Sequence, residues 1–332
     1  MPQVEKRNAS FPLLAQQEAR AISFTDDTFR RRRVVRGFTI DDADTSDMDD
    51  AIWLEKKGKG YELTVSIADV TAFVPLGSAL DREAYDRKVT LYYPDDMSSP
   101  MFPERLSNGL FSLQEKQRRP TVTITTIFDE NLERSDPIIA LTQLESERKY
   151  SYEDINEALN DSGNNLHASM TDYADLANNL REKRKKDGGL IFSKSQRKGK
   201  ASIIIEEFMV ATNVSMGTYL SDHDMPALYR NHLKRLDKKA IKALIAEIEA
   251  SQDDASQSEK PKLDNKLLGK AVYCPSNEGH SALRTYSYMH GTSPIRRYAD
   301  IVNHRGIHAV YFGEEPPYSY DDLVIMSDHL NS

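Results

Sequence analysis

The pattern of apolar and polar residues divides the chain into a strand-rich first half and a helix-rich second half. Five stretches have the alternating or β-branched composition of strands, namely 34–40, 51–55, 61–69, 121–128 and 138–144. Six stretches have the apolar spacing or the start signals of helices, namely 80–88, 151–159, 173–186, 203–219, 236–249 and 296–310. Because the two kinds of element are segregated rather than alternating, the pattern predicts an α+β fold.

Local signals place several boundaries of these elements. The glycine-containing segment 57–60 predicts a hairpin turn between the second and third strands. Ser151 is a predicted helix N-cap, with Asp154 as its capping-box partner three residues later. Residues 1–30 lack strong periodicity and are expected to form an arm, and the polar stretch 250–262 is expected to be an exposed loop.

The segment between the first two predicted strands is crowded with acid. It places six aspartates within ten residues: Asp41, Asp42, Asp44, Asp47, Asp49 and Asp50. Carboxylates this close repel one another, so folding them together costs free energy unless a cation neutralises them. Carboxylate oxygens suit Mg²⁺ or Mn²⁺, which indicates a metal site for phosphate chemistry. The best candidates for ligands are Asp41, Asp47, Asp49 and Asp50.

The acidic run has two other interpretations. A calcium-binding loop needs a glycine at its sixth position and a glutamate at its twelfth, but Asp47 and Trp53 stand there. The calcium loop is therefore set aside. A solvated acidic loop stays possible for the run taken alone.

Composition limits the class of protein. The chain has 332 residues, 39% of them hydrophobic and 29% charged, which is typical of a globular protein. Its single cysteine, Cys274, excludes an internal disulfide framework and a multi-cysteine zinc site. No apolar run approaches the ~20 residues of a membrane span, and the N-terminus lacks an apolar signal region. We therefore expect a cytoplasmic protein without a membrane partner.

The distribution of charge is uneven. The net charge of −8 argues mildly against a dedicated nucleic-acid binder. Basic residues nevertheless gather in two clusters, 30–36 and 183–200. They would suit a polyanion held against the carboxylates, or they are simply solvated surface.

Three further segments carry candidate chemistry. Ser293-Pro294-Ile295-Arg296-Arg297 could start a helix and bind a phosphate, although such arginines also make structural salt bridges. Tyr92 could stack on a nucleoside or be part of the core. The pair Glu206-Glu207 lies on an otherwise apolar predicted helix and could combine one functional and one solvated residue, or be wholly solvated.

Taken together and in this order, these segments closely resemble the catalytic domain of the ribonuclease II/ribonuclease R family of exoribonucleases. The similarity covers about 36–306. It is carried by the acidic run, by Tyr92-Tyr93-Pro94 with Pro103-Glu104-Arg105-Leu106-Ser107-Asn108-Gly109-Leu110, by Glu206-Glu207-Phe208-Met209, and by Thr292-Ser293-Pro294-Ile295-Arg296-Arg297-Tyr298-Ala299-Asp300. The resemblance implies a mixed β-sheet core surrounded by helices.

The resemblance also implies roles for individual residues. Asp41, Asp47, Asp49 and Asp50 match the family's metal-binding and catalytic aspartates, with Asp49 at the central position. Arg296 matches the arginine that steadies the scissile phosphate, and Tyr152 the aromatic that stacks near the 3′ end. Tyr92 and Glu206 match residues near the terminal ribose. The implied activity is Mg²⁺- or Mn²⁺-dependent 3′→5′ hydrolysis of single-stranded RNA to nucleoside 5′-monophosphates.

The sequence departs from the family pattern in several places. We expect an arm over 1–30 and one catalytic domain over 31–332, shortened at its C-terminal end and without the OB-type RNA-binding domains that usually flank it. Gly291 stands where the family pattern has an aromatic residue. Two alternatives therefore stay open: a non-catalytic or weakly active RNA-binding protein on the same fold, and an unrelated two-metal phosphoesterase or DNA nuclease.

Overall fold

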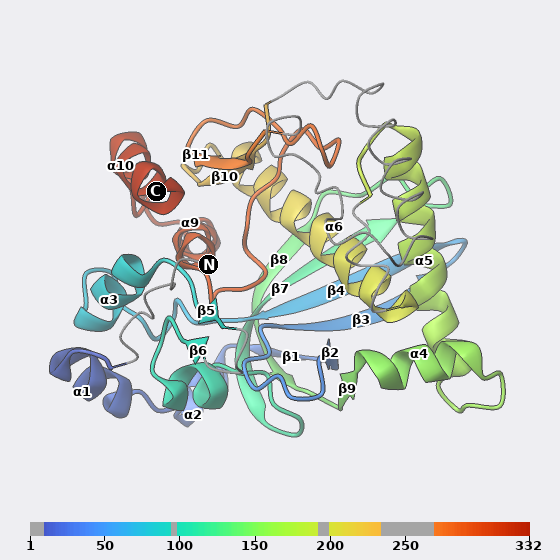
Figure 1. Cartoon of the computed structure of the whole chain (residues 1–332), viewed down its shortest axis with the longest axis horizontal. Helices are drawn as coiled ribbons and strands as arrows, with labels where there is room; N and C mark the ends of the chain where they lie inside the picture. The colour runs from blue at the N-terminus through green and yellow to red at the C-terminus, as the bar shows by residue number, and fades with distance from the viewer. Residues whose placement is uncertain (1–9, 94–97, 192–198, 234–268) are drawn as a thin grey trace, which may run out of the picture.

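A five-stranded sheet forms the centre of the protein (Figure 1), whose computed structural model describes residues 10–93, 98–191, 199–233 and 269–332. The strand order is β1-β8-β7-β4-β3, with β1 parallel to β8 and the other neighbours antiparallel. The described strands are β1 (Arg33–Val35), β2 (Thr39–Asp41), β3 (Asp50–Lys57), β4 (Gly60–Ala68), β5 (Leu91–Tyr92), β6 (Ser98–Ser99), β7 (Arg118–Phe128), β8 (Ile138–Glu145), β9 (Lys149–Ser151), β10 (Tyr229–Asn231) and β11 (Val272–Cys274).

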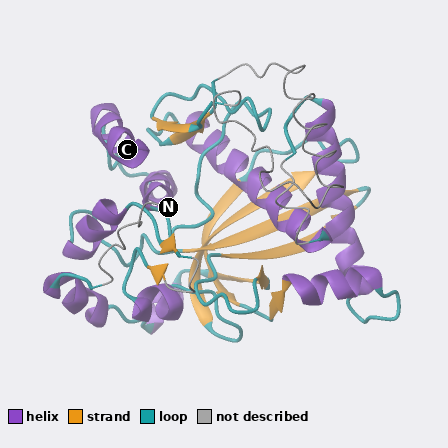
Figure 2. Ribbon diagram, in the orientation of Figure 1, coloured by secondary structure: helices purple, strands orange, loops and turns teal. Residues whose placement is uncertain are grey.

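Helices surround this sheet (Figure 2), so the predicted α+β class with a mixed sheet is confirmed. The described helices are α1 (Leu13–Ala21), α2 (Asp26–Arg30), α3 (Ala79–Arg87), the π-helical turn η1 (Arg105–Leu110), α4 (Tyr152–Asn160), α5 (His167–Lys186), α6 (Lys200–Asp222), α9 (Tyr298–Phe312) and α10 (Tyr320–Asn331). None of these described helices has the length and apolar character needed to cross a lipid bilayer.

Two apolar cores join the central sheet to the helices around it. In the first, alternate residues of β4, Leu63, Val65 and Ile67, pack with α4, α5 and α6. The second lies where the strands begin or end, and there Ala51 and Ala68 join α1, α3, η1, α9 and α10. The acidic run lies between β2 and β3 in the chain, and it contributes Met48 to the second core.

Most predicted elements are present. The hairpin is β3 and β4 joined at residues 58 and 59, and the predicted helices of the first half are α3 and α4. Ser151 and Asp154 form the predicted capping box at α4. The Ser151 N–H donates to Asp154 Oδ2 at 2.8 Å, and the Asp154 N–H donates to Ser151 Oγ at 3.0 Å. The predictions for 236–249 and 250–262 lie outside the described residues.

The first predicted strand, 34–40, is broken in two. β1 pairs with β8 in the central sheet, whereas β2 pairs in parallel with β9. Between them Phe38 bridges Ile52 of β3 through hydrogen bonds of 3.3 and 2.9 Å. Because side chains on strands alternate, local periodicity cannot reveal that a strand changes partners. This change of partner carries Asp41 out of the central sheet and towards β9.

The segment predicted to be an arm contains two helices from residue 13 onward. Ala15 and Ala19 of α1 are buried in the second core. The Glu18 carboxylate accepts hydrogen bonds of 3.0 and 2.7 Å from the N–H groups of Ala79 and Leu80 at the start of α3. These contacts explain why helix α1 forms without strong periodicity, since docking on α3 stabilises it. Two further differences are that α5 begins at His167, earlier than predicted, and that α10 was not predicted.

A buried ion-pair cluster ties α9 to the sheet. The Asp69 carboxylate follows β4, with Arg32 Nη2 at 2.5 Å and His308 Nε2 at 2.9 Å from its two oxygens. Burial on its own would raise the pKa of Asp69, but His308 and Arg32 more than offset this effect and hold the pKa below its ordinary value. The ionised carboxylate is therefore part of the folded state.

We expect Asp69→Asn to lower the free energy of unfolding by about 3 kcal/mol near neutral pH, because it removes one partner of a buried pair. A carboxylate with a lowered pKa stabilises the fold above its unfolded pKa of about 4, and this contribution is lost as the pH falls further. The difference between the two proteins should therefore shrink below about pH 4. Urea unfolding of the parent and of Asp69→Asn, at neutral pH and below about pH 4, measures this difference in the free energy of unfolding. Equal stability of the two proteins at neutral pH would contradict the prediction.

Candidate active site

The acidic run forms a loop with a carboxylate at each end. Asp41 is the last residue of β2, and Asp50 is the first residue of β3. Burial raises the pKa of Asp41 to about 6, and burial together with the Asp41 carboxylate raises the pKa of Asp50 to about 7. The two groups therefore resist being ionised together, and a bound cation would remove that cost.

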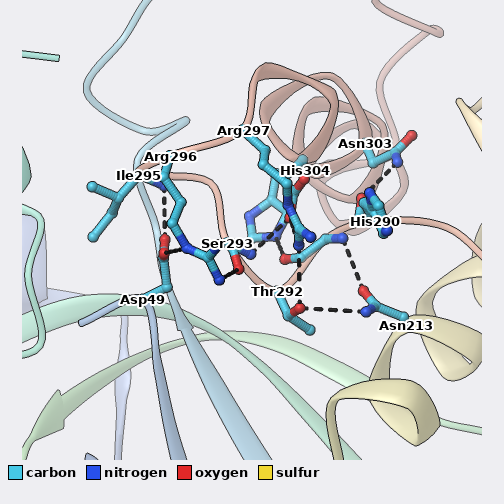
Figure 3. A network of polar contacts seen from close by, with 12 residues as sticks. Asp49, Asn213, His290, Thr292, Ser293, Ile295, Arg296, Arg297, Asn303 and His304 are labelled. Carbon is cyan, nitrogen blue, oxygen red and sulfur yellow. Dashed lines mark hydrogen bonds and ion pairs between the residues drawn. The ribbon is translucent and has the colours of Figure 1, made fainter. Parts of the chain in front are cut away.

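Asp49 is bound through both of its carboxylate oxygens (Figure 3). Its Oδ1 accepts a hydrogen bond of 2.8 Å from the Ile295 N–H, and its Oδ2 lies 3.2 Å from Arg296 Nε. Burial raises the pKa of Asp49 well above its ordinary value, because Arg296 and Ile295 offset only part of the desolvation. The side chain of Asp49 is 3% exposed, but that of Arg296 is 42% exposed, so Arg296 reaches from the buried carboxylate to the surface.

Arg296 is presented by a loop rather than by the first turn of a helix. The N–H groups of Arg296 and Arg297 donate hydrogen bonds of 3.2 and 3.0 Å to the Ser293 carbonyl oxygen. The backbone of Arg297 is then extended, and α9 starts at Tyr298. The helix start predicted at residue 296 is thus two residues early, because a tight turn and one extended residue precede the helix.

Buried polar side chains hold this loop in place (Figure 3). Asp300 Oδ1 accepts from the Ser293 N–H at 2.7 Å and from Arg297 Nη2 at 2.8 Å. Asn213 of α6 accepts from the Gly291 N–H at 2.9 Å. Asn213 could not be recognised from the sequence, because it contacts a segment 78 residues away and has no motif of its own.

Gly291 leaves room for a neighbouring methionine. A Cβ added at this position would lie 2.5 Å from Met216 Cε and 2.8 Å from Met216 Sδ. On its other side, the Gly291 carbonyl oxygen is 2.6 Å from His304 Nε2. The aromatic side chain of the family pattern therefore cannot fit here unless Met216 of α6 moves.

Two of the predicted tyrosines flank the acidic run. The Tyr92 hydroxyl donates a hydrogen bond of 2.7 Å to Asp47 Oδ2, and burial together with this bond raises the pKa of Tyr92. Tyr152 is the first residue of α4. Burial, followed by the charges of Asp50 and Asp41, raises the pKa of Tyr152.

Glu206 is held by helix α5. Its carboxylate oxygens lie 3.5 Å from Arg181 Nη1 and 3.4 Å from Arg184 Nη2, and its side chain is 25% exposed. Its neighbour Glu207 is buried and lies 2.6 Å from Arg184 Nη2. Within the described residues, the ion pairs of Glu206 join it to α5 and not to the acidic run.

The basic clusters are largely paired inside the chain. Arg36 is 2.7 Å from Glu147, and Lys183 is 2.6 Å from Glu133. Part of the second cluster, at 194–198, lies outside the described residues. The described part therefore makes ion pairs within the chain, which neither of the two predicted interpretations named.

The four aspartates fit a divalent cation in charge and in donor chemistry. Their oxygens are the ligands that Mg²⁺ and Mn²⁺ prefer, and the pKa values of Asp41 and Asp50 are raised chiefly by burial, with the Asp41 charge adding to the effect on Asp50. In the described part of the chain, however, no three acidic, histidine or cysteine side chains are gathered into a ready coordination site. Asp47 and Asp49 instead bind Tyr92 and Arg296.

Comparison with known proteins identifies the family. The sequence profile of the RNB domain matches residues 30–313. The chain belongs to the ribonuclease II/R family. Ribonuclease R of Thermotoga maritima is 33% identical over an alignment of length 317 that covers 80% of this chain and 44% of that protein. The chain therefore spans less than half the length of this family member.

Solved structures of similar proteins share the fold. The apo form of Mycoplasma genitalium RNase R superposes with a TM-score of 0.80 at 25% identity, covering 97% of this chain and 59% of that chain. The yeast pseudonuclease Ssd1 superposes with a TM-score of 0.73 at 19% identity, covering 93% of this chain and 44% of its own. A pseudonuclease thus shares the ribonuclease II/R fold, so the fold alone does not establish activity.

Proposed function

We propose that the chain is a metal-dependent exoribonuclease that shortens single-stranded RNA from its 3′ end and releases nucleoside 5′-monophosphates. One observation carries the proposal: Asp49 of the acidic run and Arg296 of the loop before α9 meet although they are 247 residues apart. Carboxylates for a metal and a guanidinium for a phosphate thus share one site. The names of the relatives, ribonuclease R, support the same activity.

In this proposal Asp41, Asp47, Asp49 and Asp50 would hold two divalent cations. When bound, these ions would supply an activated water and would stabilise charge on the leaving 3′ oxygen. The buried environment of Asp49 strengthens every charge interaction there, because water is excluded. The four carboxylates also fix where the scissile phosphate can sit.

Arg296 counters the charge on that phosphate as the bond breaks. Its guanidinium is part-exposed and is held by Asp49 and by the Ser293 hydroxyl, which accepts from Nη2 at 2.8 Å. Such fixed donors need little reorganisation during the reaction. The loop supported by Asp300 therefore contributes by orienting Arg296.

Tyr92 and Glu206 distinguish RNA from DNA in this proposal. A phenol or a carboxylate that bonds the 2′-hydroxyl leaves an unpaired polar group when deoxyribose binds. Arg181 and Arg184 orient the Glu206 carboxylate, and its 25% exposure leaves it accessible to a ligand.

Tyr152 stacks on the terminal base without reading its identity. Replacing it by alanine should weaken RNA binding by about 1–3 kcal/mol, the usual loss for one stacked base, whereas Tyr152→Phe should bind nearly as well as the parent. Fluorescence anisotropy with labelled RNA, in an Asp49→Asn background that prevents shortening, measures both. Equal affinity of the alanine and phenylalanine variants would refute the stacking role.

The direct test uses 5′-labelled single-stranded RNA and single-stranded DNA of the same sequence. With Mg²⁺ or Mn²⁺ we expect stepwise shortening of the RNA, release of nucleoside 5′-monophosphates and no shortening of the DNA. A chelator should stop the reaction. Equal cleavage of RNA and DNA would instead support the interpretation as a general two-metal nuclease.

A second candidate is a non-catalytic RNA-binding protein on the same fold. It is favoured by the ion pair that occupies Asp49 and by the similarity to the fold of a pseudonuclease. This candidate predicts that the RNA is retained but never shortened, with either metal. The same gel and a filter-binding assay separate the two candidates.

A further inference from the structure

The acidic loop is anchored to the rest of the fold at two points. Near its end, the Met48 N–H donates to the Ser112 hydroxyl at 3.1 Å, and the Met48 carbonyl accepts from the Leu113 N–H at 3.0 Å. Near its start, a turn is closed by a hydrogen bond of 3.0 Å from the Thr45 N–H to the Asp42 carbonyl. Asp47 lies between these two points, so the position of its carboxylate depends on both.

Lys149 forms the anchor at the start of the loop. Its Nζ donates hydrogen bonds of 2.8 Å to the Ala43 carbonyl oxygen and 2.6 Å to the Thr45 carbonyl oxygen. The backbone of Lys149 is itself fixed, because it is paired with Thr39 in β2 and its N–H donates to Glu115 Oε2 at 3.1 Å. One ammonium group on β9 therefore donates hydrogen bonds to two carbonyl oxygens of the acidic loop.

We propose that Lys149 is a positioning residue that holds the acidic loop in the shape needed to bind a divalent cation. The inference rests on the proposed metal site, which it deepens. Lys149 touches neither the metal nor the RNA in this scheme. It acts through the loop backbone, and so sets the position of Asp47 relative to Asp41.

The direction in which the affinity for a divalent cation changes when Lys149 is replaced distinguishes a positioning role from a simple effect of its charge. Lys149 is a cation beside carboxylates, and it lowers the pKa that burial gives Asp41. Removing a nearby positive charge would by itself strengthen the binding of another cation. Loss of positioning would weaken that binding, and changes to groups that orient metal ligands typically cost about 10–100-fold in affinity.

Lys183 provides a matched control. Its Nζ also holds a loop through two carbonyl oxygens, those of Leu132 at 3.1 Å and Asn131 at 3.5 Å. Its other partner is Glu133 at 2.6 Å, and none of these contacts involves the acidic run. Lys183→Met therefore removes a loop-holding lysine and one positive charge elsewhere.

The experiment measures Mn²⁺ binding to the full chain without RNA, by calorimetry or by the electron paramagnetic resonance of free Mn²⁺. We expect Lys149→Met to weaken Mn²⁺ binding by about tenfold or more. Lys149→Arg should restore most of it, because a guanidinium can also donate to two carbonyls. Lys183→Met should leave it unchanged. Circular dichroism of each variant reports whether it is folded.

Several results would overturn the inference. They are unchanged or tighter Mn²⁺ binding by Lys149→Met, an equal loss in Lys183→Met, or unfolding of both Lys149 variants, which would show a purely structural role. Absence of Mn²⁺ binding by the parent chain would remove the proposed metal site as well. If the parent binds Mn²⁺ and shortens RNA while Lys149→Met binds equally well, only the role of Lys149 fails.

Discussion

Asp49→Asn is expected to slow the shortening of RNA at least about 100-fold, because it removes a charge from the centre of the proposed site. The substitution should not unfold the protein. An amide oxygen can still accept the hydrogen bond from the Ile295 N–H, and the raised pKa of Asp49 shows that its charge is costly to bury. The rate is measured with 5′-labelled RNA at saturating Mn²⁺, and thermal unfolding is followed in parallel.

Asp44→Asn is the control for this prediction. Asp44 belongs to the same run but is exposed. Removing its charge tests whether any loss of negative charge nearby lowers the rate. We expect activity close to that of the parent. Persistent shortening by Asp49→Asn, or an equal loss in Asp44→Asn, would remove Asp49 from its central role.

The sequence alone predicted which residues of the candidate site lie close together better than how they are held in place. The aspartates, Arg296 and Tyr92 belong to motifs with fixed spacing, and the structure places Asp49 beside Arg296 and Asp47 beside Tyr92. Motifs that contain these residues, in this order along the chain, would rarely occur together by chance. Local pattern also gave the hairpin of β3 and β4, because alternation and turn residues are short-range signals.

Contacts between distant segments could not be predicted in this way. Nothing near Lys149 indicates that its ammonium bonds the carbonyls of residues 43 and 45, more than 100 positions earlier. The partners of Glu206, two arginines on α5, are likewise set by the packing of two helices. Such contacts depend on tertiary packing, which can override local propensity.

Arg296→Met is expected to lower the rate of RNA cleavage by about 100- to 1,000-fold, the usual loss when a fixed donor to developing charge is removed. Arg296→Lys should recover only part of this rate. A lysine ammonium cannot reproduce the forked geometry with which an arginine can bind Asp49, the Ser293 hydroxyl and a phosphate together.

The decisive measurement compares binding with turnover. If Arg296 acts mainly on the transition state, single-turnover cleavage at saturating RNA should fall far more than RNA affinity does. Arg297→Lys is a demanding control, because Arg297 is the adjacent arginine but bonds Asp300 rather than Asp49. A loss of RNA affinity as large as the loss of rate in Arg296→Met would instead make Arg296 a binding residue. In that case the charge that develops on the phosphate would have to be countered by the aspartate-bound metal alone.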